Sequence, residues 1–295
     1  MNTLYNKLFR IRRIIRRLLI LHSHDPRPSS APYITGDGFR KLGDHVHDET
    51  GNCDPAQVKE NDIVFVGGGR SKEFLTECNP EIKVSYTLVS HNSDELIDES
   101  YVPLLTPNIQ RWYSYNVEVQ DERIVPIPLG IENKHYYVTG DTDTITRVRK
   151  KNYPKDNVIF YGYSISTNTE ARQHAQESIV NHELARPLTV WQEFALYLPE
   201  VARCKFVQSP RGSSIEGHRT WEAMYLGAVP IVLSNVMHDY FKSLGAPMLV
   251  LQSWDELEEI TLKTIDKMYQ STLREADTKV LNMQYWEDKI RQAAR

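Results

Sequence analysis

A chain of 295 residues exceeds the usual size of a single hydrophobic core, so one large α/β domain or, as we favour, two domains are expected. The net charge of −4 argues against a general nucleic-acid binder, which needs a basic surface to neutralise phosphates. Three scattered cysteines are too few for a disulfide framework or a thiolate zinc site, and they fit a reducing compartment.

Residues 1–30 are expected to form a basic amphipathic segment followed by a Pro/Ser linker. The first twenty residues contain six Lys or Arg and no acid, and their apolar residues recur at helical spacing. Arginines interrupt every apolar run, which excludes a spanning helix. Residues 4–20 are expected either to contact an anionic membrane surface or to dock on the protein itself; a frayed terminus or a transit peptide are further alternatives.

The next part of the chain alternates between apolar runs and polar segments. Strands are expected at 61–69, 83–94 and 123–130, with a short strand and a turn over 32–39 and a short helix over 106–116. Such alternation predicts parallel strands joined by crossovers. The pattern dissolves at about 131–156, a polar and basic stretch where we place the boundary between two domains.

A second α/β series follows this boundary. Strands are expected at 157–165, 204–210, 228–235 and 247–253. Helices are expected at 168–182, over 188–202 as one or two helices, at 238–245, and over 254–270, where apolar residues recur at helical spacing. The sequence therefore predicts two Rossmann-like halves followed by a helical tail.

The stretch "SPRGSSIEGHRTWEAMYLGAVPIV", residues 209–232, combines a loop, a charged helix and a strand. A strand ending at Pro210, a loop and a helix from about Ile215 would expose backbone N–H groups at the carboxyl edge of the sheet, where anions bind. We expect a diphosphate there. Ser213 or Ser214 can cap the helix, and the loop and helix offer further donor-binding candidates: Arg211, Gly212, Glu216, His218, Arg219 and Glu222.

The charged residues of this stretch share adjoining ridges of the predicted helix. His218 and Glu222 are four apart, and Glu216, Arg219 and Glu222 step by three. A carboxylate placed there can accept hydrogen bonds from both hydroxyls of a ribose. The alternative is an exposed helix whose charges form ion pairs only.

This stretch resembles the donor-binding signature of exostosin-like glycosyltransferases of the GT-B class. The matching residues are Pro210, Gly212, Arg219, Glu222, Ala223, Gly227, Val229, Pro230 and Ile231. The resemblance implies an α/β fold of two Rossmann-like domains that face each other across a cleft: an acceptor domain at 31–135 and a nucleotide-sugar donor domain at 156–271, with a helix at 272–295 packing back on the first.

By the same resemblance, Glu222 would bind the ribose, while Arg219 and the 211–214 loop would hold the diphosphate. We would expect an aspartate in related sequences where Glu216 stands, so the resemblance assigns no role to Glu216.

An inverting transferase needs a base to take the proton of the acceptor hydroxyl. Asp37, His91 and Asp94 follow predicted strands of the first domain, at the edge that would face the cleft. Each residue type is also common in turns and helix caps. We rank Asp37 and Asp94 above His91 because enzymes of this kind commonly employ a carboxylate; a retaining reaction would require no such base.

Three other motifs are expected to form neither a metal site nor a P-loop, although the glycines of one are expected near the donor diphosphate or the acceptor. Asp141 and Asp143 in "GDTDT" would lie in a solvated loop of the linker. The run "GGGRSK" at 67–72 lacks the spacing of a P-loop, and its glycines are expected to let the backbone approach the cleft. His45 and His47 would diverge on a helix, so no metal and no cofactor is predicted.

The sequence thus predicts a hexosyl- or pentosyltransferase, inverting and metal-independent, that moves a sugar from a nucleoside-diphosphate sugar to a glycan or lipid-linked glycan. Its expected setting is polysaccharide biosynthesis in the cytoplasm, with peripheral membrane contact as an option. The alternatives are a sugar-nucleotide epimerase on the same fold and a non-catalytic binding or scaffold protein.

Overall fold

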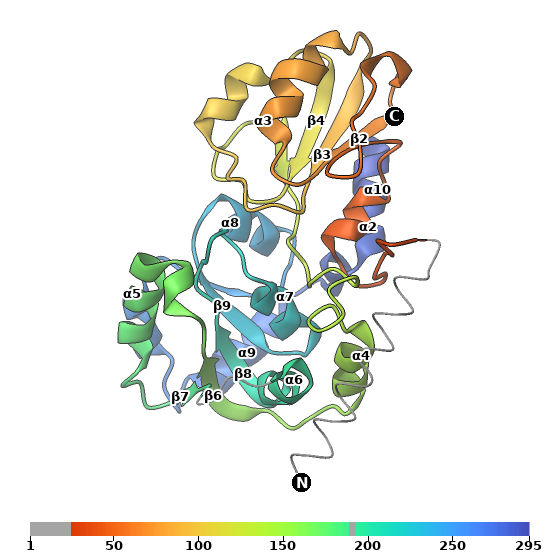
Figure 1. The fold of residues 1–295 in the computed structure, drawn as a ribbon. Helices are drawn as coiled ribbons and strands as arrows, with labels where there is room; N and C mark the ends of the chain where they lie inside the picture. The colour runs from red at the N-terminus through yellow and green to blue at the C-terminus, as the bar shows by residue number, and fades with distance from the viewer. Residues whose placement is uncertain (1–24, 189–192, 295) are drawn as a thin grey trace.

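The computed structural model describes residues 25–188 and 193–294, which form two parallel sheets of five strands each (Figure 1). The first sheet has the order β1-β2-β3-β4-β5, and the second has the order β10-β9-β8-β6-β7. Helices separate most consecutive strands. The predicted fold class, α/β with two Rossmann-like halves, is confirmed.

The first sheet consists of β1 (His45–His47), β2 (Ile63–Val66), β3 (Tyr86–Ser90), β4 (Ile109–Ser114) and β5 (Ile124–Pro126). Every residue of β2 and β3 is buried, as expected for parallel strands covered on both faces. The helix predicted over 106–116 is wrong, because Trp112 pairs with Leu88 of β3 and Ile124 of β5. The strand predicted over 32–39 is also wrong, since α2 (Gly36–Arg40) begins after its N-cap Thr35.

The second sheet consists of β6 (Asp156–Tyr161), β7 (Ala185–Pro187), β8 (Cys204–Gln208), β9 (Val229–Leu233) and β10 (Leu249–Leu251). Its helices are α5 (Thr169–Ile179), α6 (Phe194–Arg203), α7 (His218–Tyr225), α8 (Val236–Ser243) and α9 (Ile265–Arg274). The helix predicted over 254–270 is divided into a 3₁₀ turn, Trp254–Glu259, and α9. Part of the helix predicted over 188–202 lies outside the described residues.

The shorter elements are α3 (Ser71–Glu73), a π-helical turn at Phe74–Cys78, and 3₁₀ turns at Pro55–Gln57, Asn79–Glu81, Glu99–Leu104, Ile165–Thr167 and Thr278–Leu281. No helix within residues 25–188 and 193–294 is both long and apolar enough to cross a membrane. The basic segment predicted at residues 4–20 lies outside this part of the chain.

The polar stretch at 131–156 is not a plain linker, because it contains α4 (Thr142–Lys150). Ile145 and Val148 are buried, and α4 contacts α6 and α7. Asp141 caps the first turn by accepting from the Thr144 N–H at 2.9 Å. The solvated loop predicted for "GDTDT" is therefore wrong: two apolar residues three apart suffice to anchor a helix whose other positions are polar.

The last helix, α10 (Met283–Ala293), returns to the first sheet and lies beside α2 (Figure 1). The Tyr113 hydroxyl of β4 donates to the Lys289 carbonyl at 3.4 Å, and the Met283 N–H donates to the Pro32 carbonyl at 3.0 Å. Trp286 is fully buried in a core that includes residues of both sheets. The predicted fold class includes such a return of the C-terminal helix to the first half of the chain.

Candidate active site between the two sheets

The loop that follows β8 joins the carboxyl edges of the two sheets through three hydrogen bonds. The Ile215 N–H donates to Asn116 Oδ1 at 2.9 Å, and the Ser214 hydroxyl donates to Asp94 Oδ1 at 2.7 Å. The Leu129 N–H donates to Glu216 Oε2 at 2.9 Å. Parallel strands present ligands at their carboxyl ends, so this junction is the natural place for a site.

These contacts correct the predicted start of the helix. The α7 helix begins at His218 with Gly217 as N-cap, and no side chain caps it. Ser214 bonds to Asp94 instead, and Ser213 is exposed. The first turn of α7 starts three residues later than expected because residues 214–216 bind the first domain.

Glu216 is buried and its two carboxyl oxygens are engaged by protein groups. In addition to the Leu129 N–H, Trp221 Nε1–H donates to Oε1 at 3.0 Å. Burial raises the pKa of Glu216 to about 8, although both hydrogen bonds act in the opposite direction. Glu216 therefore links two parts of the fold rather than facing a ligand.

Two of the predicted donor-binding residues, Arg219 and Glu222, line the same cavity. Its volume is about 340 Å³, and Leu188, Phe194, Tyr197 and Val138 also line it. Arg219 Nε donates to the Tyr197 hydroxyl at 3.2 Å. Burial raises the pKa of Glu222, while His218, Arg219 and the Tyr197 hydroxyl favour its charged form.

A second arginine, which the sequence did not single out, lies over the same tyrosine ring as Arg219. The guanidinium carbons of Arg172 and Arg219 lie 5.7 and 5.8 Å from the centre of the Tyr163 ring. Arg172 donates to the carbonyls of Arg211 and Ser164 at 3.0 and 2.8 Å. Burial and the charge of Arg219 lower the pKa of Arg172. Arg172 lies near the start of a helix that follows a strand, a position that could have signalled it.

Gly212 has a structural reason in this arrangement. A Cβ at Gly212 would lie 2.5 Å from Arg172 Nη2, so a side chain there would displace the guanidinium. Arg211, in contrast, is not grouped with Arg219: it lies 3.6 Å from Glu118 and lines a separate cavity of about 600 Å³ with Ser209, Asn235 and Trp254.

A further cavity, of about 520 Å³, lies at the carboxyl edge of the first sheet. It is lined by Gly36, Asn92, Asp94, Tyr136 and His218, among others. His218 Nδ1 lies 2.9 Å from the Gly130 carbonyl, and Nε2 lies 3.5 Å from Glu132. The α7 helix therefore lines both cavities: His218 lines this one, and the next residue, Arg219, lines the 340 Å³ cavity.

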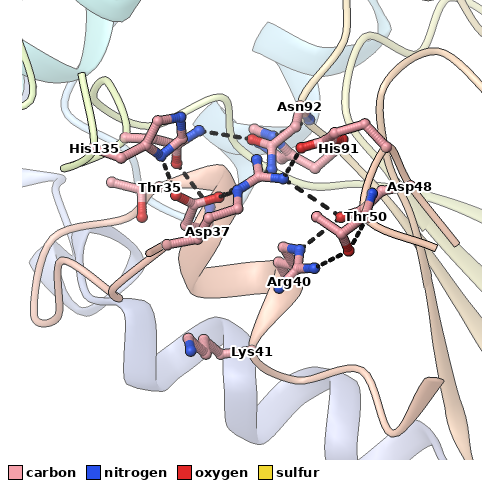
Figure 2. A network of polar contacts seen from close by, with 12 residues as sticks. Thr35, Asp37, Arg40, Lys41, Asp48, Thr50, His91, Asn92 and His135 are labelled. Carbon is pink, nitrogen blue, oxygen red and sulfur yellow. Dashed lines mark hydrogen bonds and ion pairs between the residues drawn. The ribbon is translucent and has the colours of Figure 1, made fainter. Parts of the chain in front are cut away.

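Asp37 lies beneath this cavity with its side chain completely buried. Arg27 Nε donates to Oδ1 at 2.9 Å, and His135 Nδ1 lies 2.7 Å from Oδ2 (Figure 2). His135 itself lines the cavity. The sequence did not indicate His135, because it lies in the stretch assigned to a linker and no local pattern surrounds it.

The other two predicted bases already have partners. His91 Nε2 donates to the Pro128 carbonyl at 3.0 Å, and Nδ1 accepts from the Asn92 N–H at 2.7 Å. Burial lowers the pKa of His91 to about 4, so the ring is neutral. Asp94 accepts the Ser214 hydroxyl.

The two histidines and the glycine run that the sequence also singled out lie in the first half of the chain, on and after the first strands. His45 and His47 lie on a strand rather than a helix; His45 Nε2 lies 2.8 Å from Asp62 Oδ2, and His47 Nδ1 accepts from the Cys53 N–H. Gly68 and Gly69 have positive φ in the turn after β2. Within the described ranges, no three His, Cys, Asp or Glu side chains are grouped as metal ligands.

No protein-family model matches this chain, and no curated protein sequence does. Among solved structures it is similar to α,α-trehalose 6-phosphate synthase from Burkholderia multivorans (10% identity, 81% of this chain and 72% of that chain, TM-score 0.45). It is also similar to Anabaena HepE in complex with UDP and glucose (10%, 78% and 77%, 0.45) and to the catalytic domain of Arabidopsis thaliana starch synthase IV bound to ADP and acarbose (12%, 79% and 73%, 0.37).

Proposed function

We propose that this chain is a GT-B glycosyltransferase that moves a sugar from a nucleoside-diphosphate sugar to a hydroxyl acceptor. One observation carries the proposal: Glu222 and Arg219 share a cavity, and Arg172 stands with Arg219 around Tyr163 at the carboxyl edge of the second sheet. A buried carboxylate and an arginine in one cavity, with a second arginine over the same tyrosine ring as the first, suit a ribose joined to a diphosphate.

The proposed donor site uses each group according to its chemistry. Glu222 accepts hydrogen bonds from the ribose hydroxyls. The nucleobase of the donor rests against the apolar surface of Leu188 and Phe194. Arg219 and Arg172 bond to the diphosphate and stabilise the negative charge that develops as it departs. These two arginines supply the positive charge needed for a metal-independent transfer.

The acceptor is assigned to the 520 Å³ cavity on the first sheet, whose polar lining suits a hydroxyl-rich molecule such as a glycan or lipid-linked glycan. In an inverting transfer, the acceptor oxygen attacks the anomeric carbon and the bond to the diphosphate breaks. One chain segment lines both cavities: Tyr136 lines the acceptor cavity, and Val138, two residues later, lines the donor cavity. Hexosyl or pentosyl transfer in polysaccharide biosynthesis, with residues 4–20 on a membrane surface, completes the proposal.

A panel of nucleoside diphosphates and their sugars tests this function. One member should raise the melting temperature, since a ligand at 100 times its Kd stabilises the folded state by about 2.7 kcal/mol. The sugar nucleotide should then release its diphosphate when candidate glycans are added. If no member stabilises the protein, the donor site is wrong. Epimerisation without diphosphate release would favour the epimerase, and binding without turnover would favour a scaffold.

Where UDP is the panel member that stabilises the wild type, the Arg172→Gln variant should bind it about 10- to 100-fold more weakly, because hydrogen bonds to charged groups contribute about 1.5–3 kcal/mol. Uridine should bind the variant and the wild type equally, since it carries no phosphate. Isothermal titration calorimetry measures both. The control is Arg291→Gln, which removes an arginine paired with Glu287 on α10. An equal loss for uridine and UDP would mean that Arg172 only supports the fold.

A further inference from the structure

We propose that His135 is the base that takes the proton of the acceptor hydroxyl, and that Asp37 positions it. This inference rests on the proposed transferase function. His135 lines the acceptor cavity, and its Nδ1 lies 2.7 Å from the buried Asp37 Oδ2. Because an ionised carboxylate can only accept a hydrogen bond, Nδ1 carries the ring proton and Nε2 holds the lone pair.

Nε2 is available for an acceptor hydroxyl. In the part of the chain that the structure describes, no hydrogen bond or ion pair occupies this nitrogen. The arrangement is that of a base held by a third group, in which the carboxylate fixes the tautomer and stabilises the imidazolium that forms. Asp37 cannot itself reach an acceptor in this geometry, since Arg27 and His135 bond to its two oxygens.

The two segments that carry this pair are joined by hydrogen bonds from backbone N–H groups. The Asp37 N–H donates to Asn133 Oδ1 at 2.7 Å, and the Ile131 N–H donates to the Ile34 carbonyl at 2.9 Å, so the segments are joined just before His135. Asn133 Nδ2 also donates to Asn92 Oδ1 at 2.9 Å (Figure 2). At Gly36, a Cβ would overlap Asn92 Oδ1. These contacts hold the imidazole in one place, as a catalytic group requires.

The position of His135 along the chain brings it near the donor. Val138, three residues later, lines the donor cavity with Glu222. Three residues span at most about 11 Å, so the backbone of His135 lies within that distance of the donor cavity wall. Of the predicted bases, His91 has both nitrogens engaged and Asp37 has both oxygens engaged, while Asp94 lines the same cavity as His135 and accepts from Ser214 with Oδ1.

The proposed step balances without a further reactant. The proton of the acceptor hydroxyl passes to His135 Nε2 while its oxygen forms a bond to the anomeric carbon. The bond between that carbon and the diphosphate oxygen breaks, and its electron pair leaves with the diphosphate. The imidazolium then returns its proton to solvent.

The test uses the full chain and the sugar nucleotide that the wild type consumes. Replacing His135 by alanine should lower transfer to a hydroxyl acceptor about 10²- to 10⁴-fold, the range for loss of a general base, with unchanged UDP affinity. Asp37→Asn should lower it by about 10-fold or more through loss of the tautomer. Added imidazole should restore part of the His135→Ala rate.

Azide provides the second readout, because it is a nucleophile with no proton to remove. His135→Ala should form the glycosyl azide as fast as the wild type. The matched control is His45→Ala, which breaks a histidine–aspartate pair of similar length at the opposite edge of the same sheet and should leave transfer unchanged.

The outcomes separate the two proposals. Wild-type hydroxyl transfer by His135→Ala overturns the inference, and so does an equal loss of azide and hydroxyl transfer without imidazole rescue, which would make His135 structural. If the wild type consumes no sugar nucleotide, the proposed function itself fails.

Discussion

Where UDP is the nucleoside diphosphate that stabilises the wild type, the Glu222→Gln variant is expected to bind it about 10- to 100-fold more weakly, because a hydrogen bond to a charged group contributes about 1.5–3 kcal/mol. Glutamine keeps the shape of the side chain and removes the charge. Glu222 is buried beside Tyr197, Arg219 and His218, so few waters can replace the lost interaction. Isothermal titration calorimetry with UDP measures the effect.

A deoxy probe locates the lost interaction. The wild type should bind 2′-deoxyuridine diphosphate more weakly than UDP, whereas Glu222→Gln should distinguish the two poorly; this double-mutant comparison isolates the contact. Glu177→Gln makes the same chemical change on the exposed side of α5 and should behave as the wild type. Equal UDP affinity in Glu222→Gln and the wild type would show that Glu222 interacts only with groups of the protein and does not contact the nucleotide.

The Glu216→Ala variant is expected to lose about 2–6 kcal/mol of unfolding free energy. It leaves two buried donors, the Leu129 N–H and Trp221 Nε1–H, without an acceptor, and each such group costs about 1–3 kcal/mol. Urea unfolding followed by tryptophan fluorescence measures the change. The control is Glu177→Ala, and a loss no larger than in this exposed variant would contradict the linking role.

The stability of the wild type should also depend on pH through Glu216. Burial raises its pKa in the folded state from 4.5 to about 8, so between these values the folded protein holds a proton that the unfolded chain has released. The contribution of this group therefore falls as pH rises from about 4.5 to about 8. Glu216→Gln lacks this titration and should lose less stability between pH 5.5 and 8. If the free energy of unfolding changed equally with pH in the wild type and in Glu216→Gln, the pKa of Glu216 would not be raised.

The sequence predicts most strands because their apolar runs are long enough to stand out. Besides the short strands β1 and β7, the sequence missed the strand β4 and the helix α4, for identifiable physical reasons. In β4, Gln110 and Arg111 interrupt the buried residues, so the segment reads as amphipathic. In α4, Ile145 and Val148 are the buried apolar residues within a polar stretch, and their packing on α6 and α7 could not be anticipated.

The site divides in the same way. The sequence places Arg219 and Glu222 together because they lie one turn apart on one helix, within a stretch that resembles a known signature, and the structure shows both in one cavity. Arg172 and His135 were missed because their partners, Arg219 and Asp37, are far away in the sequence. Ser214 and Glu216 were assigned to the donor because their partners in the first domain could not be read from the local pattern.

The three hydrogen bonds between residues 214–216 and the first domain have a kinetic consequence. Separating the sheets at this loop would cost roughly 1.5–4.5 kcal/mol for these three bonds, at about 0.5–1.5 kcal/mol per bond. Because α7 begins two residues after this loop, any such separation would also move Arg219 and Glu222. Under the proposed function, release of a molecule bound to α7 would therefore be coupled to any such separation of the two sheets.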